Sequence, residues 1–370
     1  MVTPSLPLRI CQISSVMPPS RDGVGDAVFK LHTLLSRHNI PAYVITSSDQ
    51  QQTENVFCCV DRWTMRSWRV IYRKLKDNKI SSVIFHYPSP RYYRIVSLSF
   101  LPFFLRLLGF HVTLYLHEYS EYSLAGKLRM LPMIIFSRTI ATSDSLNVHA
   151  LRRLYLTRGK INLIPTGSNF SENMPSRWTG GSFSAQPQKR LALVFGLIRS
   201  GKGIESVLRA FEGNTILQGL CELHLAGSLP EVTTPYDLQL LEQIKALSFV
   251  RYHGYLSSSQ LREIFSAAHF LILPFENGLS ERRGSFMAAM ASGMPVVTVI
   301  PTIPIEGLVD NYNVVYLNDN TIAEIEKKLL LLSTTEDKML KQIGANARRW
   351  YVSHYSDDIL FQKLSAIVNN

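Results

Sequence analysis

Cysteine is scarce in this chain of 370 residues. The four present are Cys11, Cys58, Cys59 and Cys221, and no two of them form a CxxC pair. Few cysteines without a pairing pattern are typical of a reduced, intracellular protein rather than a disulfide-bonded secreted one. The first ten residues also lack the cationic region and apolar run of a secretory signal. We therefore expect free thiols and a cytoplasmic location.

Long apolar runs are scarce as well. The segment that comes nearest to a membrane span, residues 95–110, contains Pro102 and Arg106. It is shorter than the ~20 apolar residues that a spanning helix needs. Two interpretations stay open: the segment is a helix buried in the core, or it docks on a membrane face. The second would make the protein peripheral on the inner face of the membrane.

Several catalytic patterns are absent. The sequence has no HExxH, no Cys/His cluster at metal-ligand spacing, no GxSxG and no DxD motif, so we expect no metal site. The glycine segment from Arg21 to Asp26 lacks the third glycine of GxGxxG. Thr46-Ser47-Ser48 stands where an NAD ribose needs a carboxylate. We therefore expect no nicotinamide, and no other cofactor.

Acidic residues are few relative to basic ones. The chain has 39 Lys and Arg against 28 Asp and Glu, which gives a net charge of +11. This excess predicts an anionic partner: nucleic acid, an anionic membrane surface or a phosphorylated ligand. No zinc-knuckle spacing and no RNP-type aromatic motif is present, which argues against nucleic acid.

Short β-branched apolar runs alternate with helical patterns along the chain. They lie at residues 9–14, 42–46, 83–87, 112–117, 139–143, 161–165, 191–195, 222–226, 250–253, 270–273, 296–299 and 314–317. Nearly continuous apolar runs are typical of parallel strands covered on both faces. The alternation predicts doubly wound α/β sheets. Residues 171–190, rich in Ser, Gly, Gln and Pro, have the composition of a linker between two domains.

Two strand-to-helix turns in the second half carry cations. The first holds Arg199 and Lys202, and it is not a P-loop because Gly203 follows the lysine. The second holds Arg282 and Arg283. Positive charge at a helix N-terminus is unfavourable by roughly a few tenths of a kcal/mol unless an anion is bound there.

A single anion between the two turns would relieve both. We expect a phosphate-bearing ligand gripped by Arg199, Lys202 and the backbone N–H groups of a helix that starts at Gly284-Ser285. A solvated turn and an unrelated surface charge cluster are the alternatives for these two segments.

The first half offers two further candidate sites. Gly23-Val24-Gly25 precedes a helical pattern, and the glycines suit either a backbone that approaches a ligand or a tight turn. His86 and His117 end predicted strands, where ligands of parallel sheets bind. A purely structural role is the alternative for each histidine.

In this order the segments resemble the GT-B glycosyltransferases of the retaining, family-4 type, over nearly the whole chain. Met17-Pro18-Pro19 with Gly23-Val24-Gly25 resembles the N-terminal glycine loop of that family. His117 is similar to the histidine that ends a strand and contacts the donor sugar. Ile164-Pro165-Thr166-Gly167 resembles the "IPNG" turn.

The second half continues the resemblance. Residues 196–203, from Gly196 on, have the spacing of the "GRxxxxKG" phosphate motif. Residues 253–256, with Tyr255 and Leu256, resemble the turn that contacts the nucleobase. Residues 289–297 resemble "EAMAxGxPVV".

Three positions depart from the family pattern and define a divergent branch. Leu197 replaces an arginine, and Arg199 on the same loop is the expected substitute. Ser280 and Ala288 stand where the family has two glutamates. Ala288 cannot hold a ribose, whereas Glu281, one residue after Ser280, is expected to meet the sugar hydroxyls.

The resemblance implies two Rossmann-like α/β domains that face each other across a cleft. The expected acceptor domain is residues 1–172, with a helix of residues 354–370 packed on it, and the expected donor domain is residues 186–353. The implied activity is retaining, metal-independent transfer of a sugar from a nucleotide diphosphate sugar. UDP-glucose is the expected donor, because it is a common one. The expected acceptor is a glycan or a lipid-linked molecule in cell-envelope or exopolysaccharide synthesis.

The residues expected to take part follow from the same resemblance. Those expected to act in catalysis are His117, Arg199 and Lys202. Those expected to bind the donor are Gly23, Val24, Gly25, Gly196, Tyr255, Leu256, Glu281, Arg282, Arg283, Gly284 and Ser285. The missing glutamates leave a non-catalytic nucleotide-sugar or polysaccharide-binding protein as an alternative. A GT-B epimerase, a phosphorylase and an inverting transferase are further alternatives.

Overall fold

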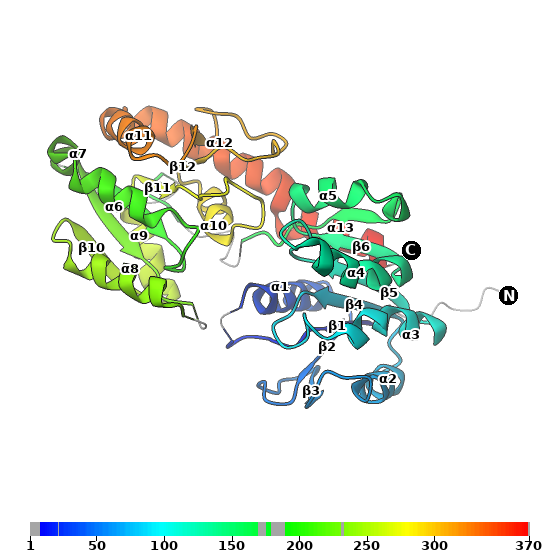
Figure 1. Ribbon diagram of the computed structural model, residues 1–370. Helices are drawn as coiled ribbons and strands as arrows, with labels where there is room; N and C mark the ends of the chain where they lie inside the picture. The colour runs from blue at the N-terminus through cyan, green and yellow to red at the C-terminus, as the bar shows by residue number, and fades with distance from the viewer. Residues whose placement is uncertain (1–7, 21, 169–174, 179–188, 231–232, 369–370) are drawn as a thin grey trace. The chain divides into compact units, whose positions relative to one another are not determined.

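The computed structural model describes residues 8–20, 22–168, 175–178, 189–230 and 233–368. The chain divides into two compact units, Met1–Thr166 with Asp357–Asn370, and Gly167–Ser356 (Figure 1). Each unit is a parallel sheet with helices around it, which confirms the expected pair of Rossmann-like α/β domains. The predicted linker lies largely outside the described residues, so the predicted domain limits stay a prediction.

The first unit contains a sheet of seven parallel strands in the order β3-β2-β1-β4-β5-β6-β7. The strands are β1 Ile10–Ile13, β2 Ala42–Ser47, β3 Val56–Val60, β4 Ser82–Tyr87, β5 His111–Leu116, β6 Thr139–Thr142 and β7 Ile161–Leu163. The strand order reverses between β1 and β4, and ligands of such sheets bind beyond the carboxyl ends at that point. His86 lies near the end of β4, and His117 directly follows β5.

Helices cover the apolar strands of this sheet. They are α1 Gly23–Arg37, α2 Ser67–Asp77, the 3-10 helix η1 Val96–Phe100, α3 Leu101–Leu107, α4 Leu124–Phe136, α5 Ser145–Arg152, the 3-10 helix η2 Tyr155–Thr157 and α13 Asp357–Val368. The C-terminal helix α13 belongs to this unit, where Leu364 and Ile367 are buried with Leu31 and Leu35 of α1. An ion pair of Arg37 and Asp357, 2.9 Å long, joins the same two helices.

The second unit contains a sheet of six parallel strands in the order β10-β9-β8-β11-β12-β13. The strands are β8 Arg190–Phe195, β9 Cys221–Ala226, β10 Val250–Gly254, β11 Phe270–Leu273, β12 Val296–Val299 and β13 Val315–Leu317. Here the order reverses between β8 and β11. The loop after β8 therefore lies where a sheet of this kind binds its ligand.

The helices of the second unit differ in how much of their surface they bury. They are α6 Ile204–Glu212, α7 Thr215–Leu220, α8 Pro235–Ala246, α9 Ser258–Ala267, α10 Gly284–Ser292, α11 Ile322–Thr334 and α12 Asp337–Tyr355. Every residue of α10 after Gly284 is buried, because α10 packs between the sheet and α12. It starts at Gly284-Ser285 and ends at Gly293 with φ of +75°, as predicted.

The predicted strands are confirmed with end shifts of one or two residues, but one strand was missed. That strand is β3, at the sheet edge beside β2. Only Val56 and Val60 of β3 are fully buried. Its five residues, VFCCV, form a short apolar run, so the sequence did carry the signal of a strand, which was overlooked.

The segment of residues 95–110 forms η1 and α3, and it is buried on one side only. Leu98, Leu101 and Leu105 are buried in the core, whereas Phe103 and Leu107 are 44% and 74% exposed. Among the residues that the structure describes, no helix is both long and apolar enough to cross a membrane.

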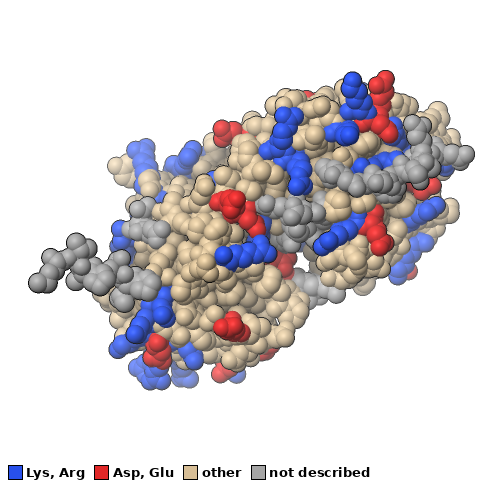
Figure 2. Space-filling model, turned by 180° about the vertical axis from the view of Figure 1, so that it is seen from behind, with Lys and Arg blue, Asp and Glu red and all other residues tan. Residues whose placement is uncertain are grey.

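The basic excess is spread over the surface. On the face seen in Figure 2, Lys and Arg side chains lie scattered over the molecule with acidic side chains among them. This face has no single continuous basic stripe of the kind that would follow a nucleic acid backbone.

Gly227, directly after β9, offers a test of how the second unit is packed. A Cβ on Gly227 would lie 1.8 Å from the carbonyl oxygen of Gly196. Gly227→Ala should therefore lower the free energy of unfolding by at least about 2 kcal/mol in urea titrations. Gly219→Ala is the control, because a Cβ there meets nothing within 4 Å. Its helical position should leave stability unchanged or raise it by up to about 1 kcal/mol. Equal stabilities for the two variants would contradict the packing.

Candidate functional site

The loop between β8 and α6 is fixed from both sides by contacts that leave no room for a side chain. Gly203, the N-cap of α6, has φ of +70°, and a Cβ there would lie 2.0 Å from the carbonyl oxygen of Pro274. On its other side, the loop touches Gly227 through the carbonyl of Gly196. The loop is therefore held between the chain after β9 and the chain after β11, at the carboxyl edge of the sheet.

This placement brings Gly196, Lys202 and Ser285 together. A Cβ built on Gly196 would lie 3.7 Å from the Cβ of Ser285, 3.8 Å from its Oγ and 3.9 Å from the Nζ of Lys202. The loop after β8 and the first turn of α10 therefore meet, although about 80 residues separate them in the sequence.

Three cations crowd the meeting point. Burial, together with the charges of Arg283 and Arg199, lowers the pKa of Lys202 from its usual 10.5 to about 7. The Nζ of Lys202 lies 5.1 Å from the ring centre of Phe275, and the Cζ of Arg283 lies 4.6 Å from it. The face of that ring attracts both cations. Because burial and repulsion cause the shift, an anion bound here would raise the pKa of Lys202 again.

The start of α10 presents donors to the same point. The first N–H groups of a helix have no partner within it. The N-cap residue is Arg283, whose guanidinium has only donors and cannot accept from these groups. The Oγ of Ser285 is buried and has no hydrogen-bond partner among the described residues. Leaving such a group unsatisfied costs about 1–3 kcal/mol. A bound anion would recover that cost.

Glu281 is bonded to a residue of α12. Its side chain is 3% exposed, and its Oε1 accepts a hydrogen bond of 3.2 Å from the hydroxyl of Tyr355. Burial, helped by the charge of Glu281, raises the pKa of Tyr355. Ala288 is fully buried in α10. The contact of Glu281 with sugar hydroxyls stays a prediction.

The remaining donor-binding residues expected in this unit lie on neighbouring turns. Tyr255 follows β10 and is 70% exposed, as a ring available for stacking would be. Leu256 is half-buried and packs on the core beside α10. Arg282 is half-buried next to Arg283. Asp237 of α8 accepts a hydrogen bond of 3.3 Å from the N–H of Ser200, which ties the cationic loop to a third element.

In the first unit His86 and His117 form a buried pair. The Nδ1 of His86 lies 3.0 Å from the Nε2 of His117, and the Nε2 of His86 lies 2.9 Å from the Oε1 of Gln12. Burial, with His117 adding to it, lowers the pKa of His86 well below its usual value. The ring of Tyr115 stacks on both histidines, with centroids 5.2 Å and 4.6 Å away.

The proton positions of this pair follow from Gln12. Its Nε2 donates to the carbonyl oxygen of Val28 at 3.1 Å, so its Oε1 must accept from His86. The neutral His86 then carries its proton on Nε2 and accepts at Nδ1 from the Nε2–H of His117. Within this chain His117 is therefore the donor to His86. His117 is 6% exposed, and Asn147 holds its backbone by donating to its carbonyl at 3.1 Å.

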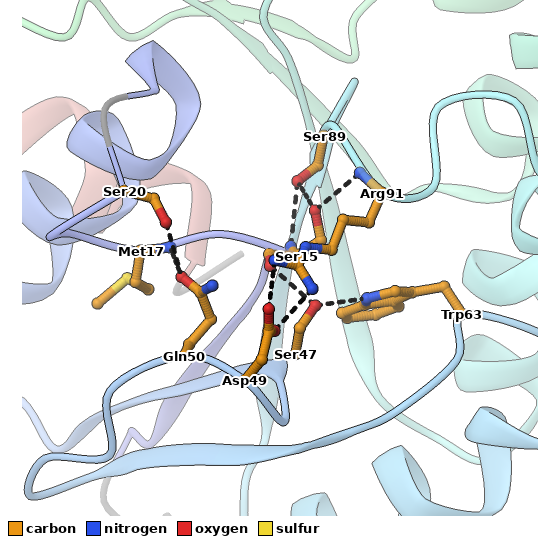
Figure 3. Close-up of polar contacts among 9 residues, drawn as sticks. All are labelled: Ser15, Met17, Ser20, Ser47, Asp49, Gln50, Trp63, Ser89 and Arg91. Carbon is orange, nitrogen blue, oxygen red and sulfur yellow. Dashed lines mark hydrogen bonds and ion pairs between the residues drawn. The ribbon is translucent and has the colours of Figure 1, made fainter. Parts of the chain in front are cut away.

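The segment between β1 and α1 is anchored by polar contacts (Figure 3). The Oγ of Ser89 lies 2.6 Å from the Oγ of Ser15, and Ser47 donates to the carbonyl of Ser15 at 2.9 Å. The N–H of Met17 donates to the Oε1 of Gln50 at 3.0 Å. Figure 3 shows these side chains converging from the ends of β2 and β4.

Gly23-Val24-Gly25 forms the first turn of α1 rather than an open loop. The side chain of Asp22 caps it and accepts from the N–H of Val24 at 2.9 Å and of Gly25 at 3.1 Å. A Cβ on Gly25 would lie 3.5 Å from the backbone of Met17. In this structure the two N–H groups are thus bonded to Asp22, and Gly25 serves close packing.

Sequence reasoning missed two residues of these sites. Gln12 offered a signal, because it is a polar side chain inside the otherwise apolar strand Ile10–Ile13. Phe275 offered no signal in the sequence, since an aromatic residue after a strand is usually part of the core. Its role here depends on which cations lie over its ring.

Comparison with known proteins gives the class. A model of the family "Glycosyl transferases group 1" matches residues 182–350, which is most of the second unit. No curated protein matches the chain.

Solved structures match over nearly the whole length. A glycosyltransferase from Rickettsia africae ESF-5 is 13% identical with a TM-score of 0.74, covering 98% of this chain and 99% of that one. Anabaena HepE in complex with UDP and glucose is 12% identical with a TM-score of 0.69, covering 98% and 100%. A sucrose-phosphate synthase from Thermosynechococcus elongatus is 14% identical with a TM-score of 0.72, covering 98% of each chain.

At these identities the structural likeness defines the fold, which is GT-B. Together with the family match it gives the class: the second unit carries the glycosyl transferases group 1 domain, and the chain is a glycosyltransferase. This agrees with the resemblance found in the sequence.

The hydrogen-bond chain through Gln12 makes a testable prediction. His86 should be neutral at pH 7 and carry its proton on Nε2, because its Nε2 faces an acceptor and its Nδ1 accepts from His117. Nitrogen-15 spectra of histidine-labelled protein distinguish the two tautomers, and the variants His86→Gln and His117→Gln assign the signals. A proton on the Nδ1 of His86 at pH 7 would contradict the arrangement.

Proposed function

We propose that this glycosyltransferase transfers a sugar, with retention and without a metal ion, from a nucleotide diphosphate sugar to a glycan or lipid-linked acceptor. The observation that carries the proposal is the convergence of Gly196, Lys202 and Ser285, with Arg199 and Arg283 close enough to lower the pKa of Lys202. Such a group of cations and unpaired donors is suited to a diphosphate.

The diphosphate is the leaving group of the reaction. As the bond from the sugar to the diphosphate breaks, negative charge grows on the diphosphate oxygen. Donors that are already oriented toward that charge stabilise the transition state more than the ground state. Lys202, Arg199, the Ser285 hydroxyl and the first N–H groups of α10 would act in this way. The position of Lys202 is fixed by the loop contacts of Gly203 and Gly227, and Ser285 belongs to the buried helix α10, so little reorganisation is needed.

The donor sugar and acceptor would involve the first unit. His117, fixed by His86 and Gln12, would contact a hydroxyl of the donor sugar. UDP-glucose is the proposed donor, supported by the similar Anabaena protein that was crystallised with UDP and glucose. A role in cell-envelope or exopolysaccharide synthesis is proposed from the basic surface and the apolar segment of residues 95–110.

A non-catalytic sugar-nucleotide-binding protein is the second candidate. It is favoured by one observation: Ala288 replaces a glutamate, and Glu281 is bonded to Tyr355 within the core. Incubation with UDP-glucose and a panel of acceptors separates the two candidates. The transferase releases UDP in proportion to acceptor, whereas a binding protein retains the intact donor. An epimerase would change the sugar with no acceptor present.

Removing the two cations of the loop tests the site. Arg199→Ala with Lys202→Ala should lower kcat by at least about 10²–10³-fold, since each supplies charge to the transition state. The control is Arg209→Ala with Lys245→Ala, which removes two exposed cations from the same unit. UDP release should be measured for both. Turnover in the loop variant equal to that of the control would remove Arg199 and Lys202 from the mechanism.

The low pKa of Lys202 predicts a pH dependence of donor binding. The cationic form binds the diphosphate, and a bound anion raises its pKa, so affinity is full below pH 7 and falls as the pH rises through about 7. UDP-glucose, whose phosphates stay ionised, should bind about 10- to 30-fold more weakly at pH 8.5 than at pH 6.5 by calorimetry. Lys202→Arg should remove the dependence, because arginine stays charged. Constant or rising affinity in the wild type would contradict the assignment.

A further inference from the structure

Exposed apolar side chains are concentrated in one part of the first unit. Among the described residues, 23 large apolar side chains are exposed, and eight of them fall within residues 96–135. Those eight are Val96, Phe100, Phe103, Leu107, Leu108, Leu124, Leu128 and Ile135. Single exposed apolar residues are ordinary, but a contiguous group marks a binding surface.

On η1 and α3 the exposed residues form one stripe. Val96 lies in the 3-10 helix η1, and Phe100, Phe103 and Leu107 after it are spaced by three and four residues, which is the repeat of one α-helix face. They are 59%, 42%, 44% and 74% exposed. The opposite face carries the buried residues that hold the helix on the sheet. The side chains of the stripe are therefore not needed to form the core.

A second stripe runs along α4. Leu124, Leu128 and Ile135 are 75%, 57% and 40% exposed and share one face by the same spacing. The two helices lie side by side, because the rings of Phe103 in α3 and Phe136 in α4 are 4.6 Å apart. Arg106 also donates to the carbonyl of Phe136 at 3.2 Å. The two stripes thus belong to one surface, called here the α3–α4 surface.

The charged residues within the two helices are all basic. Arg94 before η1, Arg106 in α3 and Arg138 after α4 are exposed. Neither α3 nor α4 contains an acidic residue. Burial lowers the pKa of His111, and the charges of Arg138 and Arg106 nearby lower it further. An apolar centre with cationic neighbours is what an interfacial membrane-binding helix pair presents.

We propose that the α3–α4 surface docks on an anionic lipid bilayer. The apolar stripes would enter the boundary between headgroups and acyl chains, and the arginines would contact lipid phosphates. A second copy of the chain fits less well, because a self-complementary contact would bring arginines against arginines with no acidic partner on either helix. The inference concerns a surface outside the donor site, so it does not depend on the proposed donor.

Flotation with lipid vesicles tests the proposal with the full-length protein. Wild type should bind vesicles in which about a third of the lipid is phosphatidylglycerol, and bind pure phosphatidylcholine vesicles at least about tenfold more weakly. Leu107→Ser with Leu128→Ser should lower binding to the anionic vesicles at least about tenfold. Arg94→Ser with Arg138→Ser should reduce binding to the anionic vesicles only.

The matched control is Met65→Ser with Met339→Ser, which are 62% and 55% exposed and belong to neither η1, α3 nor α4. This control should bind vesicles as the wild type does. Calorimetry with UDP-glucose and circular dichroism should be unchanged in all these variants, so a failure of the donor assignment is seen separately from a failure here. Wild type that ignores anionic vesicles, or a Leu107/Leu128 variant that binds them fully, would overturn the proposal. The proposal would also be overturned if the wild type were a dimer and the Leu107/Leu128 variant a monomer.

Discussion

Two backbone contacts decide where the cationic loop of the second unit lies. Gly203 lies against the carbonyl of Pro274, and the carbonyl of Gly196 lies against Gly227, with no room for a side chain at either glycine. These contacts fix Lys202 beside Ser285 in spite of the repulsion from the neighbouring arginines. The fold thus stabilises an arrangement that is electrostatically unfavourable when empty. A bound anion removes the repulsion, so an anionic ligand should stabilise the folded second unit.

The candidate site of the first unit is a pair of histidines rather than a group of cations. Its buried histidine pair is held by an amide from β1 and a stacked tyrosine from β5, and burial keeps His86 neutral. A neutral, oriented ring suits recognition of a hydroxyl rather than a phosphate. Under the proposed function, the two units would divide the recognition of a sugar nucleotide by chemistry: positive charge in one, and hydrogen bonding in the other.

The sequence predicted the architecture well because apolar runs and glycines report local requirements. The strand pattern, the start of α10 and its end at Gly293 were all readable. The edge strand β3 was missed although its residues, VFCCV, form an apolar run. Within the sites, the cations at two helix starts pointed to a shared anion. The sequence did not predict which side chains are hydrogen-bonded to each other across the fold. The pairs Glu281 with Tyr355 and His86 with Gln12 depend on distances between elements that are far apart in the sequence.

The central claim is that the loop after β8 and the start of α10 together hold a diphosphate. A crystal structure with UDP tests it most directly. The account predicts phosphate oxygens within hydrogen-bond distance of the Nζ of Lys202, the Oγ of Ser285 and the first N–H groups of α10. A diphosphate bound elsewhere, with Lys202 and Ser285 still facing each other and no ligand between them, would contradict it.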